Sequence, residues 1–179
     1  MDIETKVIDN FLNEKDFHQI KNYFVFNNDI PLNLNRRVVN KADGDITLGD
    51  LPYWYWYATH TFYFGNEIWK DRRDSFEIIK PILRAIGDLG LGYGLIRGKL
   101  NFYPYTETVY EHKPHYDFPF PTYGAIFSLN TCDGFTRLSD GTKVDSIENR
   151  MLFLDASKNH NSSTTSNSYG RFNINFNFR

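Results

Sequence analysis

The sequence predicts a mainly β fold of the α+β class, in which helices pack on one face of an antiparallel sheet. Aromatic residues make up 17% of the chain, including 16 Phe and 12 Tyr, and such residues are enriched in strands. Helical periodicity is confined to the first half of the chain, whereas the residues from Leu95 onward show only strand and loop patterns. Helices that precede the strands, rather than alternating with them, are typical of an antiparallel sheet with helices on one side.

Size and composition predict one domain that spans residues 1–179. A chain of 179 residues is long enough for a full hydrophobic core, and it contains no repeat, linker or low-complexity segment. The formal charge of −2 and the pI of about 6.2 do not favour a polyanion as the main partner. The chain has one cysteine, Cys132, no signal-peptide pattern and no apolar run of about 18 residues. We therefore expect a soluble, cytoplasmic protein without a membrane span.

The helices are expected within residues 13–90, as a support for the sheet. A short strand at 6–12 leads into a helix over 13–27. The apolar residues of this helix recur at spacings of three and four, at Phe17, Ile20 and Phe24. A second helical segment covers 71–89, and Pro81 predicts a kink or a restart within it.

The clearest strand pattern of the first half covers residues 53–64. It follows a stretch at 28–52 that reads as loops around a short strand near 36–39. One face of the pattern carries Trp54, Trp56, Ala58, His60, Phe62 and Phe64. The other face carries Tyr53, Tyr55, Tyr57, Thr59, Thr61 and Tyr63. His60 lies on the apolar face and is expected as a hydrogen-bonded core histidine, while the tyrosines either line a substrate groove or pack against a helix.

The β core is expected over residues 95–179. Asp140-Gly141 joins two short strand patterns, 135–139 and 142–145, in a two-residue hairpin. A further apolar strand at 148–156 leads to His160, which we expect at or just past its end. The Ser/Thr/Asn-rich residues 157–169 are expected to form a loop at the mouth of a barrel.

Two strands of this core carry an unusual polar face. In one, Arg97, Lys99, Asn101 and Tyr103 alternate with apolar residues. In the last strand, Arg171, Asn173, Asn175 and Asn177 do the same. The polar face lies in water in an ordinary sandwich, but it turns inward in a jelly roll that houses a polar ligand. The alternation alone leaves both arrangements open, and the position of the candidate ligand-binding groups on these faces favours the jelly roll.

His115 and Asp117 are the first two candidate metal ligands. They are two residues apart, so on an extended segment both side chains point to the same face. His160 is the candidate for the third ligand, which would complete a two-histidine, one-carboxylate site of the kind that binds a redox-active divalent metal. Arg171 follows eleven residues later and opens the last strand. His112 lies three residues before His115, on the opposite face, and is expected outside the metal site.

The ordered set of Tyr103, the H-x-D motif at 115–117, His160 and Arg171 resembles the iron(II)/2-oxoglutarate oxygenases. Within that family the resemblance is to the prolyl-4-hydroxylase-like branch, and it covers nearly the whole chain. The segment Asn130-Thr131-Cys132-Asp133-Gly134 and the hairpin resemble the compact members encoded by tailed bacteriophages. The family fold is a double-stranded β-helix, a cupin-like jelly roll.

The resemblance implies a dioxygenase that hydroxylates an unactivated C–H bond and releases succinate and CO2. His115, Asp117 and His160 would bind Fe(II), with 2-oxoglutarate and O2 as cosubstrates and L-ascorbate as a candidate reductant. Arg171 would bind the far carboxylate of 2-oxoglutarate, since its guanidinium donates two parallel hydrogen bonds. Ser128 takes the position of a hydroxyl partner of that carboxylate, and Tyr103 that of a tyrosine beside the cosubstrate.

The substrate is expected to be a protein or peptide side chain, with proline as the first choice. The first alternative is an oxidative demethylase of the alkylation-repair type, because Asn101-Phe102-Tyr103 and the run from Arg171 to Phe176 also resemble that class. The second arginine of that class is missing, since position 177 is Asn. The second alternative is a non-catalytic jelly-roll binding protein. The sequence does not indicate an oligomeric state.

Overall fold

The computed structural model describes residues 3–36 and 52–179, and these form three helices and eleven strands. The helices are α1 (Glu14–Val25), α2 (Arg73–Ile78) and α3 (Lys80–Asp88). The strands are β1 (Lys6–Ile8), β2 (Asn33–Asn35), β3 (Tyr57–Phe64), β4 (Glu67–Ile68), β5 (Leu95–Pro104), β6 (Tyr123–Ser128), β7 (Phe135–Leu138), β8 (Lys143–Asp145), β9 (Met151–Asp155), β10 (His160–Ser162) and β11 (Gly170–Phe178).

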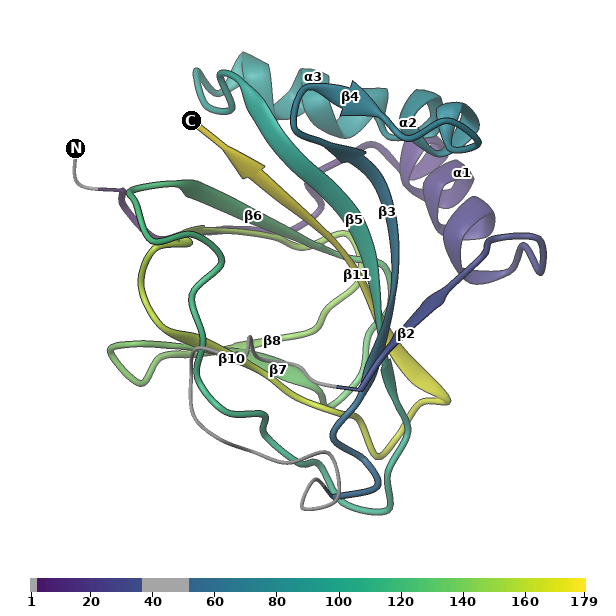
Figure 1. The fold of residues 1–179 in the computed structure, drawn as a ribbon, viewed down its shortest axis with the longest axis vertical. Coiled ribbons are helices and arrows are strands. Elements are labelled where there is room, and N and C mark those ends of the chain that lie inside the picture. Colours follow the sequence, from purple (N-terminus) through teal and green to yellow (C-terminus); the bar gives the residue numbers. More distant parts are fainter. Residues whose placement is uncertain (1–2, 37–51) are drawn as a thin grey trace.

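The strands form two antiparallel sheets that face each other. The larger sheet has the order β1-β9-β6-β11-β5-β3-β2, with β4 paired to β3, and the smaller one has the order β10-β7-β8. Figure 1 shows the helices on the outer side of the larger sheet and the smaller sheet across the barrel from it. The predicted jelly roll with helices on one sheet is confirmed.

A side-chain cap and a proline explain where two of the helices begin. The side chain of Asn13 caps α1 by accepting the backbone N–H of Asp16 at 3.0 Å. Between α2 and α3 the helix is interrupted at Ile79, and Pro81 lies in the first turn of α3. The first turn of a helix tolerates proline because its N–H groups have no helical partner there. The predicted restart at Pro81 is therefore confirmed.

The main hydrophobic core lies between the helices and the larger sheet. Fully buried side chains from α1 and α3, such as Ile20 and Ile82, meet Phe127, Ile174 and Phe176 from the sheet. The predicted covering of the apolar face of the last strand by helices is thus confirmed. A second, smaller cluster joins the two sheets and consists of Ile126, Leu138, Val144, Leu152 and Leu154.

The predicted Asp140-Gly141 hairpin is found, but its loop has three residues, 139–141, instead of two, because Leu138 N–H donates to Thr142 O and Gly141 N–H donates to Leu138 O, both at 2.9 Å. Gly141, with a φ of 89°, takes the left-handed position that ends a three-residue hairpin loop. Among the described residues no helix is both long enough and apolar enough to cross a membrane.

The bounds of several elements differ from the sequence-based prediction. The strand expected over 53–64 begins only at Tyr57, because backbone hydrogen bonds from Tyr55 to Pro52 and from Trp56 to Trp54 close turns before it. A short strand, β2, is found at Asn33–Asn35, whereas the strand expected near 36–39 falls on residues 37–39, which lie outside the described part of the chain. The loop expected over 157–169 contains β10, which pairs with β7.

Candidate metal centre

Three side chains that can ligate a metal converge between the two sheets. His115, Asp117 and His160 each offer one ligand atom, and these atoms all lie within 4.8 Å of one another. No other group of three or more His, Cys, Asp or Glu side chains in the described part of the chain meets this criterion. The structure thus brings together the three residues that the sequence singled out.

Backbone pairing positions the triad. His115 and His160 exchange two hydrogen bonds, N–H to O at 3.0 Å and at 2.8 Å, and their ring centroids are 4.7 Å apart. Asp117 N–H donates to Ala156 O at 2.8 Å. The H-x-D segment is therefore not a regular strand, contrary to the simplest interpretation of its spacing: His115 forms an isolated bridge and the chain bends at Asp117. Its conformation is imposed by the residues around β10.

The Asp117 carboxylate is held in its charged form. One oxygen pairs with a guanidinium nitrogen of Arg97 at 2.8 Å, and the other accepts Asn177 Nδ2–H at 2.9 Å. Burial alone would raise the pKa of this carboxyl, but the charges of Arg97, His160 and Lys99 lower it well below its usual range. A carboxylate that is anionic at neutral pH can ligate a divalent cation without first losing a proton.

Each of the two imidazoles offers one ring nitrogen to a metal. Burial, and then the neighbouring His160, lowers the pKa of His115 to about 4. Nδ1 of His115 is buried and has no well-aligned hydrogen-bond partner among the described residues. Nδ1–H of His160 donates to Lys158 O at 3.1 Å, and this bond orients the ring so that Nε2 is the nitrogen available to a metal. These donors fit a divalent transition metal with open coordination positions.

The triad lines a small polar cavity together with side chains of the two strands that carry a polar face. The space open to the centre of a water molecule is about 30 Å³. The lining residues from β5 and β11 are Lys99, Asn101, Tyr103, Arg171, Asn173 and Asn175. Both polar faces therefore point inward, as in a jelly roll that houses a polar ligand.

Arg171 lies in this cavity and is 2% exposed. Its guanidinium donates to Phe135 O at 2.7 Å and to Thr136 Oγ1 at 2.8 Å, and its Cζ lies 5.4 Å from the centre of the Tyr103 ring. Its Nε has no hydrogen-bond partner, and no carboxylate of the described residues forms an ion pair with it. Burial lowers the pKa of Arg171, because its positive charge has no anionic partner there, and an anion in the cavity would offset this cost.

Of the two other residues predicted to contact the cosubstrate, one lies in the cavity and one does not. Tyr103 lines the cavity, and its hydroxyl hydrogen-bonds with Ser162. Ser128 is buried and pairs with Asn173 across β6 and β11, but it is not among the cavity-lining residues. The hydroxyl beside Arg171 is that of Thr136 on β7.

The remaining histidines lie outside the candidate metal site. His112 is 1% exposed, and its Nδ1 lies 3.0 Å from the Ser162 hydroxyl. His60 is buried beneath the helices, where its ring nitrogens contact Pro31 O and Ser75 Oγ, as expected for a core histidine.

Sequence reasoning left two cavity residues without a role. Tyr57 lines the cavity and stacks on Tyr103 with ring centroids 5.7 Å apart. Lys99 also lines the cavity, with its Nζ 5.4 Å from the centre of the Tyr57 ring. The alternation of polar and apolar residues placed Lys99 on the polar face of its strand, and this was the sequence signal for its position in the cavity.

No protein-family model and no curated protein matches this chain. Several solved structures match it over most of its length. A prolyl hydroxylase from Trichoplax adhaerens, in complex with a hypoxia-inducible factor oxygen-degradation-domain peptide, has a TM-score of 0.65 at 14% identity, over 97% of this chain and 82% of that one. The chain has the fold of the 2-oxoglutarate/iron(II) oxygenases.

Two further solved structures share this oxygenase fold. The viral collagen prolyl hydroxylase from Paramecium bursaria Chlorella virus-1, in its 2-oxoglutarate complex, has a TM-score of 0.60 at 13% identity, over 97% of this chain and 94% of that one. An oxidoreductase of the 2OG-Fe(II) oxygenase family from Burkholderia pseudomallei has a TM-score of 0.69 at 10% identity, over 97% and 84%. At these identities the likeness concerns the fold.

Proposed function

We propose that the protein is an iron(II)- and 2-oxoglutarate-dependent dioxygenase. The observation that carries this proposal is the position of an unpaired, buried guanidinium, that of Arg171, in the same cavity as the His115, Asp117 and His160 triad. A metal site alone would fit many proteins. A metal site with a separate anion-binding group deep in one polar cavity fits a cosubstrate with two anionic ends.

The roles of the chain's own residues follow from their positions. His115, Asp117 and His160 would hold the iron, which when bound supplies the activation of dioxygen coupled to decarboxylation of the oxo acid. Arg171 would bind the far carboxylate with its free N–H groups, while Phe135 O and Thr136 fix its orientation. Tyr103 would form the wall beside the cosubstrate.

Asp117 needs its own orientation, and Arg97 and Asn177 provide it. Arg97 pairs with one oxygen and Asn177 donates to the other, so both carboxylate oxygens are held by side chains of the protein itself. Preorganised ligands of this kind lower the cost of assembling an active site.

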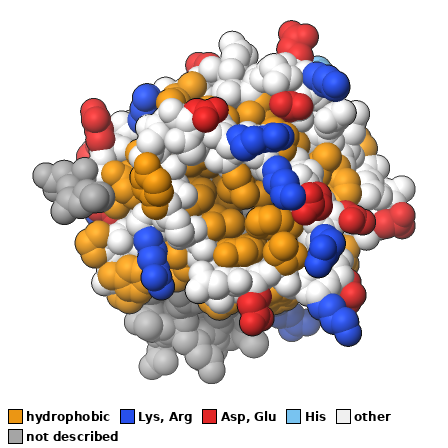
Figure 2. Space-filling model, turned by 90° about the horizontal axis from the view of Figure 1, so that it is seen from above, with side chains coloured by type: hydrophobic (Ala, Val, Ile, Leu, Met, Phe, Trp, Pro, Cys, Tyr) orange, Lys and Arg blue, Asp and Glu red, His pale blue; other side chains and the backbone are white. Residues whose placement is uncertain are grey.

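We propose that the substrate is a protein or peptide side chain, with proline as the first choice. The Trichoplax enzyme of the same fold holds a peptide, which supports this class. Exposed aromatic side chains adjoin the H-x-D motif, namely Tyr116 and Phe120, and such side chains suit contacts with a peptide. On the face shown in Figure 2, Lys and Arg side chains are interspersed with Asp and Glu and do not form a basic stripe.

The experiment that tests this proposal measures succinate release from 2-oxoglutarate by protein supplied with Fe(II) and air. Proline-containing peptides are expected to stimulate release, whereas methylated single-stranded DNA is expected to have no effect. Stimulation by the DNA alone would assign the protein to the alkylation-repair class. Absence of any iron-dependent succinate, with or without substrate, would contradict an oxygenase.

A further inference from the structure

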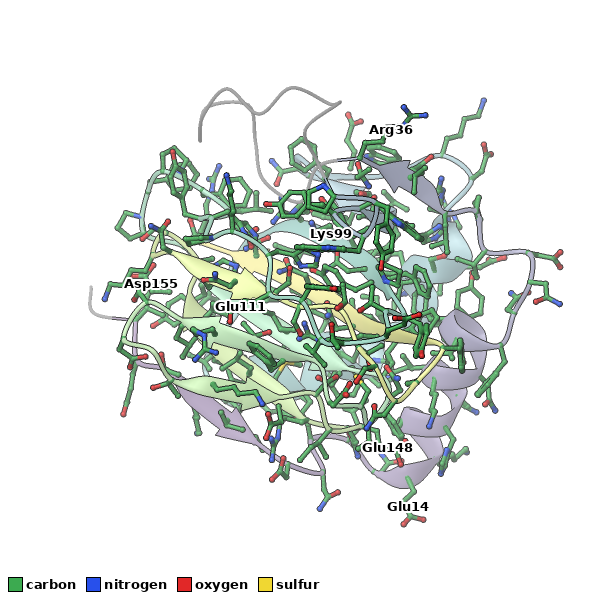
Figure 3. The ribbon with its side chains drawn as sticks, turned by 90° about the horizontal axis from the view of Figure 1, so that it is seen from below. Glu14, Arg36, Lys99, Glu111, Glu148 and Asp155 are labelled. Atoms are coloured by element: carbon green, nitrogen blue, oxygen red, sulfur yellow. The ribbon has the colours of Figure 1, made fainter. Side chains whose placement is uncertain are left out.

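Lys99 is a cation without an anionic partner in the interior of the protein. Its side chain lines the cavity that also contains the triad and Arg171. Among the described residues, no carboxylate lies within 4.0 Å of its Nζ, and its one recorded contact is with the face of Tyr57. Figure 3 shows Lys99 within the body of the molecule, in contrast to Glu14 at the periphery.

A buried ammonium without a counterion is costly. Burial, and then the neighbouring charge of Arg97, lowers the pKa of Lys99 to about 7, although the charge of Asp117 acts in the opposite direction. Nothing in the packing requires the charge, because the aliphatic stem alone could cover Tyr57. Buried charges in proteins are paired or bind ligands, so a buried lysine that forms no ion pair and lines a cavity indicates a site for an anion.

The strand registers locate Lys99 within the cavity. Lys99 pairs with Asn175, and Tyr103 pairs with Arg171, so Lys99 and Arg171 lie four residues apart along adjacent strands. At about 3.3 Å per residue, their backbone positions are about 13 Å apart. Asn175 Nδ2 lies 3.4 Å from an oxygen of Asp117, which places the triad at the level of Lys99.

The cavity therefore has one cation at each end. Arg97 is neutralised by Asp117, which leaves Lys99 beside the triad and Arg171 at the far end without anionic partners. The cosubstrate of the proposed function has two carboxylates at opposite ends of a five-carbon chain. Two separated cations match two separated carboxylates.

We propose that Lys99 binds the carboxylate of 2-oxoglutarate that lies beside the metal, at the opposite end of the cosubstrate from Arg171. This inference rests on the proposed function. Lys99 then acts in cosubstrate binding, because it neutralises the carboxylate that also meets the metal, and it contributes to selection of 2-oxo acids.

The test compares two ligands and two variants. The protein is loaded with Mn(II), which is redox-inert under these conditions, and binding is followed by calorimetry. One ligand is 2-oxoglutarate and the other is 2-oxopentanoate, which keeps the keto group and the near carboxylate but has a methyl group in place of the far carboxylate. The variants are Lys99→Met, which keeps the stem and removes the charge, and Arg171→Met.

We expect Lys99→Met to weaken both ligands by the same factor, about tenfold or more, since a hydrogen bond to a charged group is lost in each case. Arg171→Met is expected to weaken only 2-oxoglutarate. Unchanged affinity of Lys99→Met for both ligands would overturn the inference. A loss limited to 2-oxoglutarate would also overturn it, because Lys99 would then contact the far carboxylate.

Two controls separate this role from a structural one. Removal of an unpaired buried charge should leave the melting temperature of the ligand-free protein unchanged or raise it, and Mn(II) affinity should be unchanged or tighter. If Lys99→Met does not fold, Lys99→Gln carries the same expectation. If wild-type protein fails to bind 2-oxoglutarate, the proposed function fails; if it binds and Lys99→Met binds equally, only this inference fails.

Discussion

His115 and His160 face each other across an antiparallel bridge in which each residue donates its backbone N–H to the other's carbonyl, at 3.0 and 2.8 Å. Two candidate metal ligands are thus aligned by main-chain hydrogen bonds, and their ring centroids are 4.7 Å apart. The segment around His115 is otherwise irregular, so this bridge and the bond from Asp117 to Ala156 determine where the motif lies. The arrangement is preorganised by the fold.

Replacement of Asp117 by Ala should abolish metal binding. The substitution removes the one anionic ligand and leaves the guanidinium of Arg97 unpaired next to two imidazoles. We expect loss of iron-dependent turnover and of the calorimetric signal for Mn(II). His18→Ala is the matched control, since His18 is exposed on α1, and it should behave as wild type. Unchanged turnover in Asp117→Ala would eliminate the proposed metal site.

Arg171→Ala should raise the 2-oxoglutarate requirement much more than the iron requirement. Loss of a charged hydrogen-bonding partner costs about 1.5–3 kcal/mol, which corresponds to about 10- to 150-fold in the apparent KM for 2-oxoglutarate. The triad is untouched by this change, so the iron concentration for half-maximal activity should stay within about twofold. Steady-state kinetics, with the 2-oxoglutarate and the iron concentrations varied separately, measures the two requirements. Equal shifts in the two requirements would show that Arg171 has no specific role at the carboxylate.

The stability of the metal-free protein should fall as the pH is lowered from about 6.5 to 4. Burial lowers the pKa of His60 to about 4 and that of His112 to about 3, from an ordinary value of 6.5. The unfolded chain therefore binds more protons than the folded one in this range, and stability rises with pH up to about 6.5. Melting temperatures between pH 4.5 and 7.5 measure the slope.

His60→Gln should flatten this dependence, and His18→Gln should leave it as in wild type, because His60 is buried and His18 is exposed. An identical slope in His60→Gln and wild type would contradict the assignment of the effect to His60.

Two glycines offer a matched test of packing beneath the helices. A Cβ at Gly98 would lie 2.5 Å from the Phe62 ring, so Gly98→Ala should destabilise the protein by about 1–3 kcal/mol. A Cβ at Gly87 in α3 would meet nothing within 4 Å, so Gly87→Ala should stabilise it by about 0.5–1 kcal/mol. Urea unfolding curves of the two variants measure the difference. Equal midpoints would show that β3 and β5 are less closely packed than described.

Period-two alternation predicted much of the site. It placed Lys99 and Tyr103 on one polar face and Arg171 on another, and both faces line the cavity. The H-x-D spacing and His160 gave the triad, whose convergence the structure shows. These features could be predicted because strand geometry alternates side chains between faces regardless of tertiary context.

Other features depend on contacts between distant segments and could not be predicted. The aromatic run before Tyr57 alternates like a strand, but Trp54 leaves the sheet and stacks on Tyr110 with ring centroids 4.4 Å apart. The polar segment at 160–162 becomes a strand because β7 and the H-x-D segment supply partners for its backbone. Thr136 on β7 accepts a hydrogen bond from Arg171 on β11, and strand alternation does not predict such a contact between residues 35 positions apart in the chain.

A crystal structure with Mn(II) and 2-oxoglutarate is the most direct measurement of the proposed site. We expect the anomalous signal of the metal within coordination distance of His115, Asp117 and His160, and the far carboxylate of 2-oxoglutarate against the guanidinium of Arg171. A metal bound elsewhere, or a ligand whose carboxylates contact neither Arg171 nor the metal, would contradict the proposed oxygenase site.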